Sequence, residues 1–87
     1  MKMMLVIIRN EDRDTVLDAL IKAEFKATYI ASTGGFLRKG NTTLLIGTEA
    51  ERVDQAMETI RNACSPSQDG QRRATVFVLK LENFSQL

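Results

Sequence analysis

The chain has 87 residues, 44% of them hydrophobic, with 12 basic and 11 acidic side chains and no histidine. This length predicts a single domain, 1–87, because domains commonly span about 50 to 200 residues. The lack of histidine excludes His-based catalysis and His-ligated metal sites. The lone Cys64 excludes an internal disulfide and a cysteine-rich zinc site, so we expect a reduced, cytoplasmic protein. A net charge of +1 argues against DNA or RNA as a partner and leaves small nucleotides as nucleic-acid-like ligands.

The first part of the chain predicts a strand, a helix and a second strand. Residues 1–9 are short, apolar and β-branched, and the charged residues that follow exclude a signal peptide or a membrane span. Asn10 is expected to cap a helix that ends near Glu24, with acidic residues in its first turn. Alternation then predicts a strand over 25–32, with Ala27, Tyr29 and Ala31 on one side and Thr28, Ile30 and Ser32 on the other.

The second part of the chain predicts a strand, a helix and a last strand. Glycines flank a loop that ends at Gly40, and the strand over 41–47 completes a hairpin with the preceding strand. The segment 48–51 has the spacing of a capping box, and helical periodicity continues from it to about Cys64. A polar loop over 65–73 precedes a strand over 74–81.

This β-α-β-β-α-β order predicts an α+β, ferredoxin-like fold, with two helices on one face of a four-stranded antiparallel sheet. The first strand is apolar on both sides, because Met3, Leu5 and Ile7 alternate with Met4, Val6 and Ile8. The strand over 74–81 is nearly as apolar. Leaving a second apolar row in water is unfavourable, so we expect the uncovered face of the sheet to be a subunit interface.

The segment 33–42 carries the densest potential for ligand binding. Its glycines let backbone N–H groups approach an anion, its two cations supply charge, Phe36 could stack on a base, and Asn41 could bond two edges of a ligand. A solvated hairpin tip remains an equally good interpretation of composition alone. A Walker-type phosphate loop is excluded, since Asn41 and Thr42 replace the Lys-Ser/Thr pair and a strand follows instead of a helix.

The other reactive residue types have simpler explanations. Acidic residues gather at the two predicted helix starts, where they favour the helix dipole more plausibly than they form a catalytic pair. Cys64 is expected to be a small buried side chain, because there is no histidine to activate it as a nucleophile.

The motif Ser32-Thr33-Gly34-Gly35-Phe36-Leu37, followed by Gly40-Asn41-Thr42-Thr43 and Ile46-Gly47, resembles the PII-like cyclic di-AMP receptor family. Weaker matches extend over nearly the whole chain. The resemblance implies a homotrimer that binds cyclic di-AMP between subunits, signals to a downstream protein through its loops, and has no enzymatic activity, cofactor or metal. By position, it implies seven ligand-facing residues: Lys26, Thr28, Gly35, Phe36, Leu37, Asn41 and Gly47.

Two positions depart from the family pattern. Lys26 stands where the family usually has arginine, so the charge is kept but the planar fork is lost. The long family loop before the last strand is reduced to 65–73. These departures leave a second hypothesis, a ligand-free trimeric interaction scaffold that lost nucleotide binding with its shortened loop. An enzyme on the same architecture is a third, disfavoured by the absence of histidine.

Overall fold

The computed structural model describes residues 1–33, 40–66, 73–83, 85 and 87. Along the chain, the elements follow in this order: β1 (Lys2–Arg9), the short 3-10 helix η1 (Asn10–Asp12), α1 (Arg13–Lys22), β2 (Lys26–Ser32), β3 (Asn41–Thr48), a further 3-10 helix η3 (Ala50–Arg52), α2 (Val53–Ala63) and β4 (Ala74–Lys80). Among these residues, no helix has the length and apolar character needed to cross a membrane.

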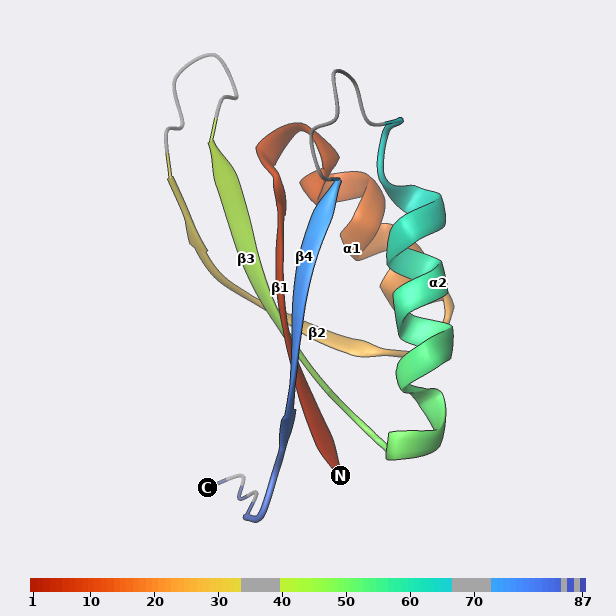
Figure 1. Cartoon of the computed structure of the whole chain (residues 1–87). Helices are drawn as coiled ribbons and strands as arrows, with labels where there is room; N and C mark the ends of the chain where they lie inside the picture. Colours follow the sequence, from red (N-terminus) through yellow and green to blue (C-terminus); the bar gives the residue numbers. More distant parts are fainter. Residues whose placement is uncertain (34–39, 67–72, 84, 86) are drawn as a thin grey trace.

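The four strands form one antiparallel sheet in the order β2-β3-β1-β4. β2 and β3 pair as the predicted hairpin, and β1 lies in the centre between β3 and β4. Both helices pack on the same face of this sheet (Figure 1). The predicted β-α-β-β-α-β, ferredoxin-like fold is therefore confirmed, and each predicted strand or helix boundary lies within a few residues of the observed one.

The hydrophobic core lies between the sheet and the two helices. On β1, Met4, Val6 and Ile8 are buried, and the residues that alternate with them are half-buried on the opposite face. Such alternation shows that only one face of the central strand is covered by helices. The remaining buried core side chains come from α1, β3 and α2, from the residue before β2 and from the residue after α2: Val16, Leu20, Phe25, Leu44, Ile46, Ala56, Ile60 and Cys64.

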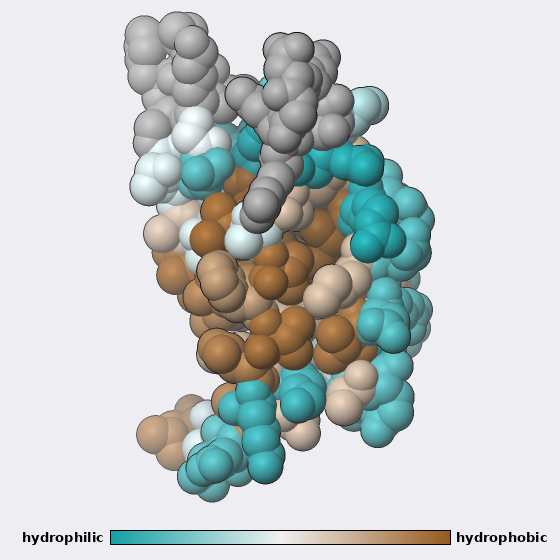
Figure 2. Space-filling view, viewed as in Figure 1, coloured by the Kyte–Doolittle hydropathy of each residue, from teal (hydrophilic) through white to brown (hydrophobic). Residues whose placement is uncertain are grey.

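The opposite face, here called the outer face, carries the second apolar row. Cross-strand partners share a face, and Leu5 pairs with both Leu45 and Phe77, while Met3 pairs with Leu79. Phe77 is 52% exposed and Leu79 is 47% exposed. Figure 2 shows apolar residues gathered over β4 and the strands behind it, beside the hydrophilic surface of α2. The predicted two-sided apolar character of the sheet is confirmed.

Both predicted side-chain caps are wrong. The residues at the N-cap positions of η1 and α1 are Arg9 and Asp12, and neither caps its helix through a side-chain hydrogen bond. Asn10 instead uses its side chain in contacts with the β2–β3 hairpin. The predicted capping box also fails, because Glu49 is the N-cap of η3, no side chain caps it, and Thr48 is buried. At Asn10, tertiary contacts replace the local helix-start bonds.

The predicted alternation of β2 breaks at Ile30. Thr28 pairs with Leu45 and Tyr29 with Leu44, but Ala31 pairs with Thr43, so one extra residue is inserted in β2. This β-bulge moves Ala31 to the outer face and Ser32 to the helix side, the reverse of strict alternation. Ser32 consequently lies opposite Thr42, within reach of Asn10.

Candidate functional site

Four of the seven residues implied by sequence lie within the described residues, and all four are exposed on the outer face. Lys26 pairs with Gly47, and Thr28 pairs with Leu45. Burial alternates along β3, so Asn41, Leu45 and Gly47 share the side away from the helices. The other three, Gly35, Phe36 and Leu37, lie outside the described residues.

Lys26, Thr28 and Gly47 form a compact group at one end of the β2–β3 ribbon. Lys26 and Gly47 are direct cross-strand partners, and Thr28 is two residues along the same side of β2. An added Cβ at Gly47 would meet no heavy atom within 4 Å. The fold of this chain therefore does not itself require glycine at position 47. The absence of a side chain there leaves open space above the backbone, beside the Lys26 ammonium group and the Thr28 hydroxyl group.

Asn41 lies at the other end of the same ribbon. It is four residues from Leu45, the partner of Thr28, which corresponds to about 13 Å along the strand. Asn41 is also the first residue of β3, where its backbone N–H donates to the Thr33 hydroxyl (3.2 Å) and its carbonyl accepts from the Thr33 N–H (2.9 Å). A ligand that touches both Thr28 and Asn41 of one subunit must be elongated.

Asn10 holds together the two strand ends that precede and follow the 34–39 segment. Its side-chain amide donates to the Thr33 carbonyl (2.8 Å), and its Oδ1 accepts from the hydroxyls of Thr42 (2.6 Å) and Ser32 (3.2 Å). Its backbone N–H donates to the Gly40 carbonyl (3.1 Å), and Gly40 has φ of 105°, a conformation that favours glycine. We refer to Ser32, Thr33 and 40–42 together as the hairpin stem.

A second polar cluster, formed by Arg9, Asp12 and Ser65, lies at the end of α2. The Asp12 carboxylate is buried and its Oδ1 accepts from the Ser65 hydroxyl (2.7 Å) and backbone N–H (3.1 Å). The Arg9 guanidinium donates to the Ser65 carbonyl (3.2 Å) and pairs with Asp12 at 3.7 Å. Arg9 Nε and Asp12 Oδ2 have no hydrogen-bond partner among the described atoms although both are buried.

Cys64 is buried next to this cluster, as predicted, and its Sγ lies 3.9 Å from the Arg73 carbonyl oxygen. Burial raises the pKa of the Cys64 thiol, and the negative charge of Asp12 raises it further, while Arg73 and Arg9 act in the opposite direction. A raised pKa keeps the sulfur in its neutral thiol form, so Cys64 is a packing residue and a poor nucleophile.

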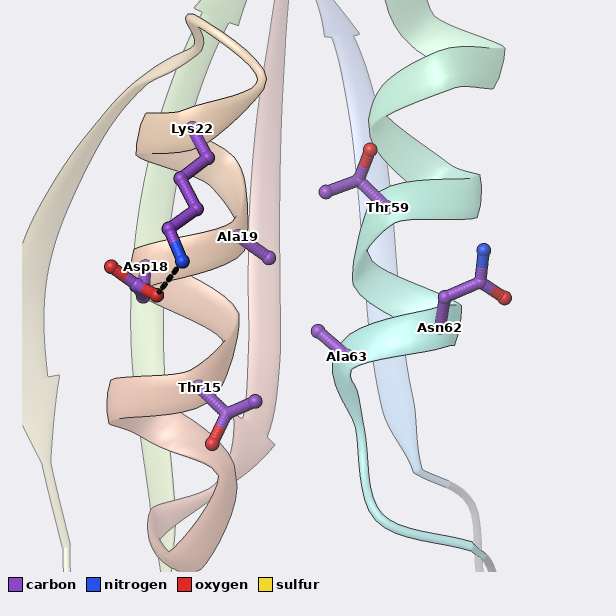
Figure 3. Close-up of a pocket in the computed structure, with 7 residues that line it drawn as sticks. All are labelled: Thr15, Asp18, Ala19, Lys22, Thr59, Asn62 and Ala63. Atoms are coloured by element: carbon purple, nitrogen blue, oxygen red, sulfur yellow. Dashed lines mark ion pairs between the residues drawn. The ribbon is translucent and has the colours of Figure 1, made fainter.

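A groove of about 420 Å³ lies between α1 and α2, on the opposite side of the molecule from the outer face (Figure 3). Asp18 and Lys22 form an ion pair at 3.0 Å, and the Thr59 hydroxyl donates to the Gln55 carbonyl, so these groups already have partners. The groove contains none of the residues implied by sequence. Its lining is Thr15, Asp18, Ala19, Lys22, Thr59, Asn62 and Ala63.

Within the described ranges, no group of three or more carboxylate or cysteine side chains is arranged to hold a metal ion. The chemistry available on the outer face is therefore hydrogen bonding by hydroxyl, amide and backbone groups, together with the positive charge of Lys26. These groups suit a polar ligand that carries negative charge.

The comparison with protein families decides the assignment. Residues 1–72 match the family described as cyclic-di-AMP receptor. The chain belongs to this family. A crystal structure of a functionally unknown protein from Pediococcus pentosaceus ATCC 25745 is similar to it, with 33% sequence identity and a TM-score of 0.77. That likeness covers 99% of this chain and 96% of the other, so it includes β4, which lies beyond the matched residues of the family.

Membership confirms the resemblance that the glycine-containing motif indicated. Because the members of this family are described as receptors of the nucleotide cyclic di-AMP, the chain is a nucleotide-binding, PII-like protein. Sequence reasoning missed Asn10, Asp12 and Ser65, because the hydrogen-bond partners of their side chains are 22 to 56 residues away along the chain and no local pattern encodes such pairs.

Proposed function

We propose that this receptor-family protein binds cyclic di-AMP in clefts between the subunits of a homotrimer. In this proposal, nucleotide binding rearranges the loop over 34–40, a downstream protein senses the rearranged loop, and no reaction is catalysed. No cofactor is needed, because the nucleotide itself is the signal. Membership of the receptor family supports nucleotide binding, and the exposed apolar side chains of the outer face support contact between subunits.

The observation that carries the proposal is the position of Lys26, Thr28 and Gly47 beside an uncovered apolar surface. The exposed side chains of Phe77 and Leu79 on β4 favour contact with another subunit. β2 and β4 are the opposite edges of the sheet. In a closed ring of subunits, head-to-tail contact would bring the β2 edge of one subunit beside the β4 edge of the next. A ligand on the β2–β3 ribbon would then lie at a subunit boundary.

The candidate residues also match the chemistry of a cyclic dinucleotide. The Lys26 ammonium suits a phosphate, the Thr28 hydroxyl suits a phosphate or ribose oxygen, and the Asn41 amide suits the donor and acceptor pair of an adenine edge. The open space at Gly47 allows a ligand to approach the backbone closely. Two bases joined by two phosphates form an elongated ligand, as the separation of Thr28 and Asn41 requires.

Calorimetric titration of the purified protein with cyclic di-AMP tests the proposal, with cyclic di-GMP, AMP and ATP as comparison ligands. We expect saturable heat with cyclic di-AMP and a matching rise in thermal unfolding temperature. Asn41→Ala should weaken binding about tenfold or more, because it removes a side chain that bonds the ligand directly. Asn62→Ala, an exposed asparagine in the groove between the helices, is the matched control.

Two results would contradict the proposal. Absence of heat and of thermal shift with cyclic di-AMP would favour the ligand-free scaffold on the same fold. Binding of cyclic di-AMP that is equally strong in the wild type and in Asn41→Ala, Thr28→Ala and Lys26→Ala would place the nucleotide away from the β2–β3 ribbon.

A further inference from the structure

The connection between β1 and α1 contacts two separate parts of the chain. Within four residues, Arg9–Asp12, it provides the partners of both the hairpin stem and Ser65 at the end of α2. Figure 1 shows this connection at the same end of the sheet as the first residues of β3, the last residues of α2 and the start of β4.

On the hairpin side, Arg9 pairs with Asn41 in the β1–β3 ladder, and Asn10 adds hydrogen bonds beyond that ladder. The backbone N–H and the side chain of Asn10 together bond Thr33, which follows β2, and Gly40 and Thr42, which lie at the start of the β3 side. Asn10 Oδ1 accepts hydrogen bonds from the hydroxyl groups of Ser32 and Thr42, whose oxygen atoms are 3.0 Å apart. A displacement of either strand end must therefore move Asn10 or break its hydrogen bonds.

The contacts on the α2 side come from Asp12 and Arg9. Asp12 is two residues beyond Asn10 in the same turn of 3-10 helix and is 4% exposed, so it cannot relax into solvent when that turn moves. Both hydrogen bonds that it accepts come from Ser65, and Arg9 adds a bond to the Ser65 carbonyl. A rotation of the turn that contains Asn10 thus changes the environment of the Ser65 backbone.

The Arg9–Asp12 pair leaves room for a second arrangement. Arg9 Nε and Asp12 Oδ2 are 3.7 Å apart and neither has a hydrogen-bond partner among the described atoms, although both are buried. Buried polar groups normally have such partners. A small movement of the turn that shortens this separation would form the missing bond.

We propose that the β1–α1 connection couples the hairpin stem to the end of α2, with Asn10 and Asp12 as the positioning residues. Given the proposed function, contact of the nucleotide with Asn41 is transmitted through Asn10 and Asp12 to Ser65. Coupling of this kind is reciprocal, so a change at Ser65 must also alter the hairpin stem. The transmission requires no direct contact between ligand and α2.

The coupling itself is tested without any nucleotide, by amide hydrogen exchange of the free protein. Asn10→Ala should accelerate exchange of the Ser65 amide, which donates to Asp12, by about threefold to tenfold. Asp12→Asn should accelerate exchange of the Thr33 amide by a similar factor, about threefold to tenfold. Asn62→Ala is the matched control for Asn10, and Asp14→Asn, exposed in the first turn of α1, is the control for Asp12.

Transmission is tested next by adding cyclic di-AMP. In the wild type, the nucleotide should slow exchange at Ser65, and in Asn10→Ala it should still bind but leave Ser65 unchanged. Asn10→Asp provides a second variant if Asn10→Ala unfolds, because it keeps the acceptor for Thr42 and removes the donor to Thr33. It should accelerate Ser65 exchange as Asn10→Ala does.

The outcomes separate the two proposals. If cyclic di-AMP does not bind the wild type, the proposed function fails and transmission fails with it, while the free-protein exchange still decides the coupling. If each substitution accelerates exchange only at the amides it contacts, the coupling is overturned even when the nucleotide binds. If Ser65 responds to nucleotide equally in the wild type and in Asn10→Ala, the route through Asn10 is overturned.

Discussion

Replacing Phe77 by serine is the most direct test of a subunit interface on the outer face. Phe77 is 52% exposed in the single chain. Taking about 200 Å² for a phenylalanine side chain, an interface that covers it removes about 100 Å² of apolar surface from water. At about 25 cal/mol per Å², Phe77→Ser costs about 2.5 kcal/mol of association free energy per subunit. Three subunits lose about 7.5 kcal/mol together, which weakens the trimer dissociation constant by roughly five to six orders of magnitude.

The fold of the single chain should survive this substitution. Phe77 faces away from the helices, and its cross-strand pair with Leu5 is worth about 0.2 to 1 kcal/mol. Sedimentation equilibrium over a range of protein concentrations measures the assembly, and circular dichroism checks the fold. Ile21→Ser is the matched control, because Ile21 is an apolar residue on α1 that is 64% exposed.

The expected result is a trimer for the wild type and for Ile21→Ser, and a folded monomer for Phe77→Ser. A wild type that is monomeric at high micromolar concentration would refute the interface altogether. A Phe77→Ser protein that stays trimeric with an unchanged dissociation constant would show that the subunits associate through another surface. Dissociation of the trimer by Ile21→Ser would show that the subunits associate through the helical face of the molecule.

Four further predictions concern single residues. Gly47→Ala should stabilise the isolated fold by about 0.5 to 1 kcal/mol and yet weaken nucleotide binding about tenfold, because the added methyl group occupies space meant for the ligand; urea unfolding and calorimetry measure the two effects. Lys26→Arg should bind cyclic di-AMP about threefold to tenfold more tightly, since a guanidinium grips phosphate at two points; equal or weaker affinity contradicts this role. Arg52→Ala should lose about 2 kcal/mol of stability in urea unfolding, because Arg52 lies 4.0 Å from the Phe25 ring centroid and donates to the Ala23 carbonyl at 2.9 Å, while Arg52→Lys should lose less. The raised pKa of Cys64 means that the unfolded chain loses the thiol proton first, so stability should fall as the pH rises above 9.0, and Cys64→Ala should remove that slope.

The strands and helices could be predicted from sequence because their signals are local. The continuous apolar run of β1, the glycines that flank the hairpin, and the apolar stripe of α2 each involve residues a few positions apart. The outer face could also be predicted, since Met3, Leu5 and Ile7 have no covering layer when both helices predicted from the sequence lie on the other face of the sheet. Local composition singled out the segment 33–42 with Phe36 and Asn41, and the family resemblance added Lys26, Thr28 and Gly47, which no local pattern indicated.

The polar network could not be predicted in this way. Asn10 and Asp12 look like helix-start residues by composition, and local capping bonds are the simplest use for their side chains. In the folded chain, Asp12 is enclosed by Arg9 and Ser65, and Asn10 lies beside the hairpin stem, so stronger sets of tertiary bonds displace the caps. Those partners become neighbours only after the sheet has formed, and no spacing in the sequence reveals them.

The bulge at Ile30 shows how one residue links the fold to the candidate site. Up to Tyr29, β2 keeps the alternation that places Lys26 and Thr28 on the outer face. Beyond Ile30, the inserted residue reverses the alternation, so Ser32 joins Thr42 on the other side and reaches Asn10. Without the insertion, Ser32 would point to the outer face and Asn10 would lose a donor from β2. The same strand can therefore present ligand-facing groups at one end and a link to the β1–α1 connection at the other.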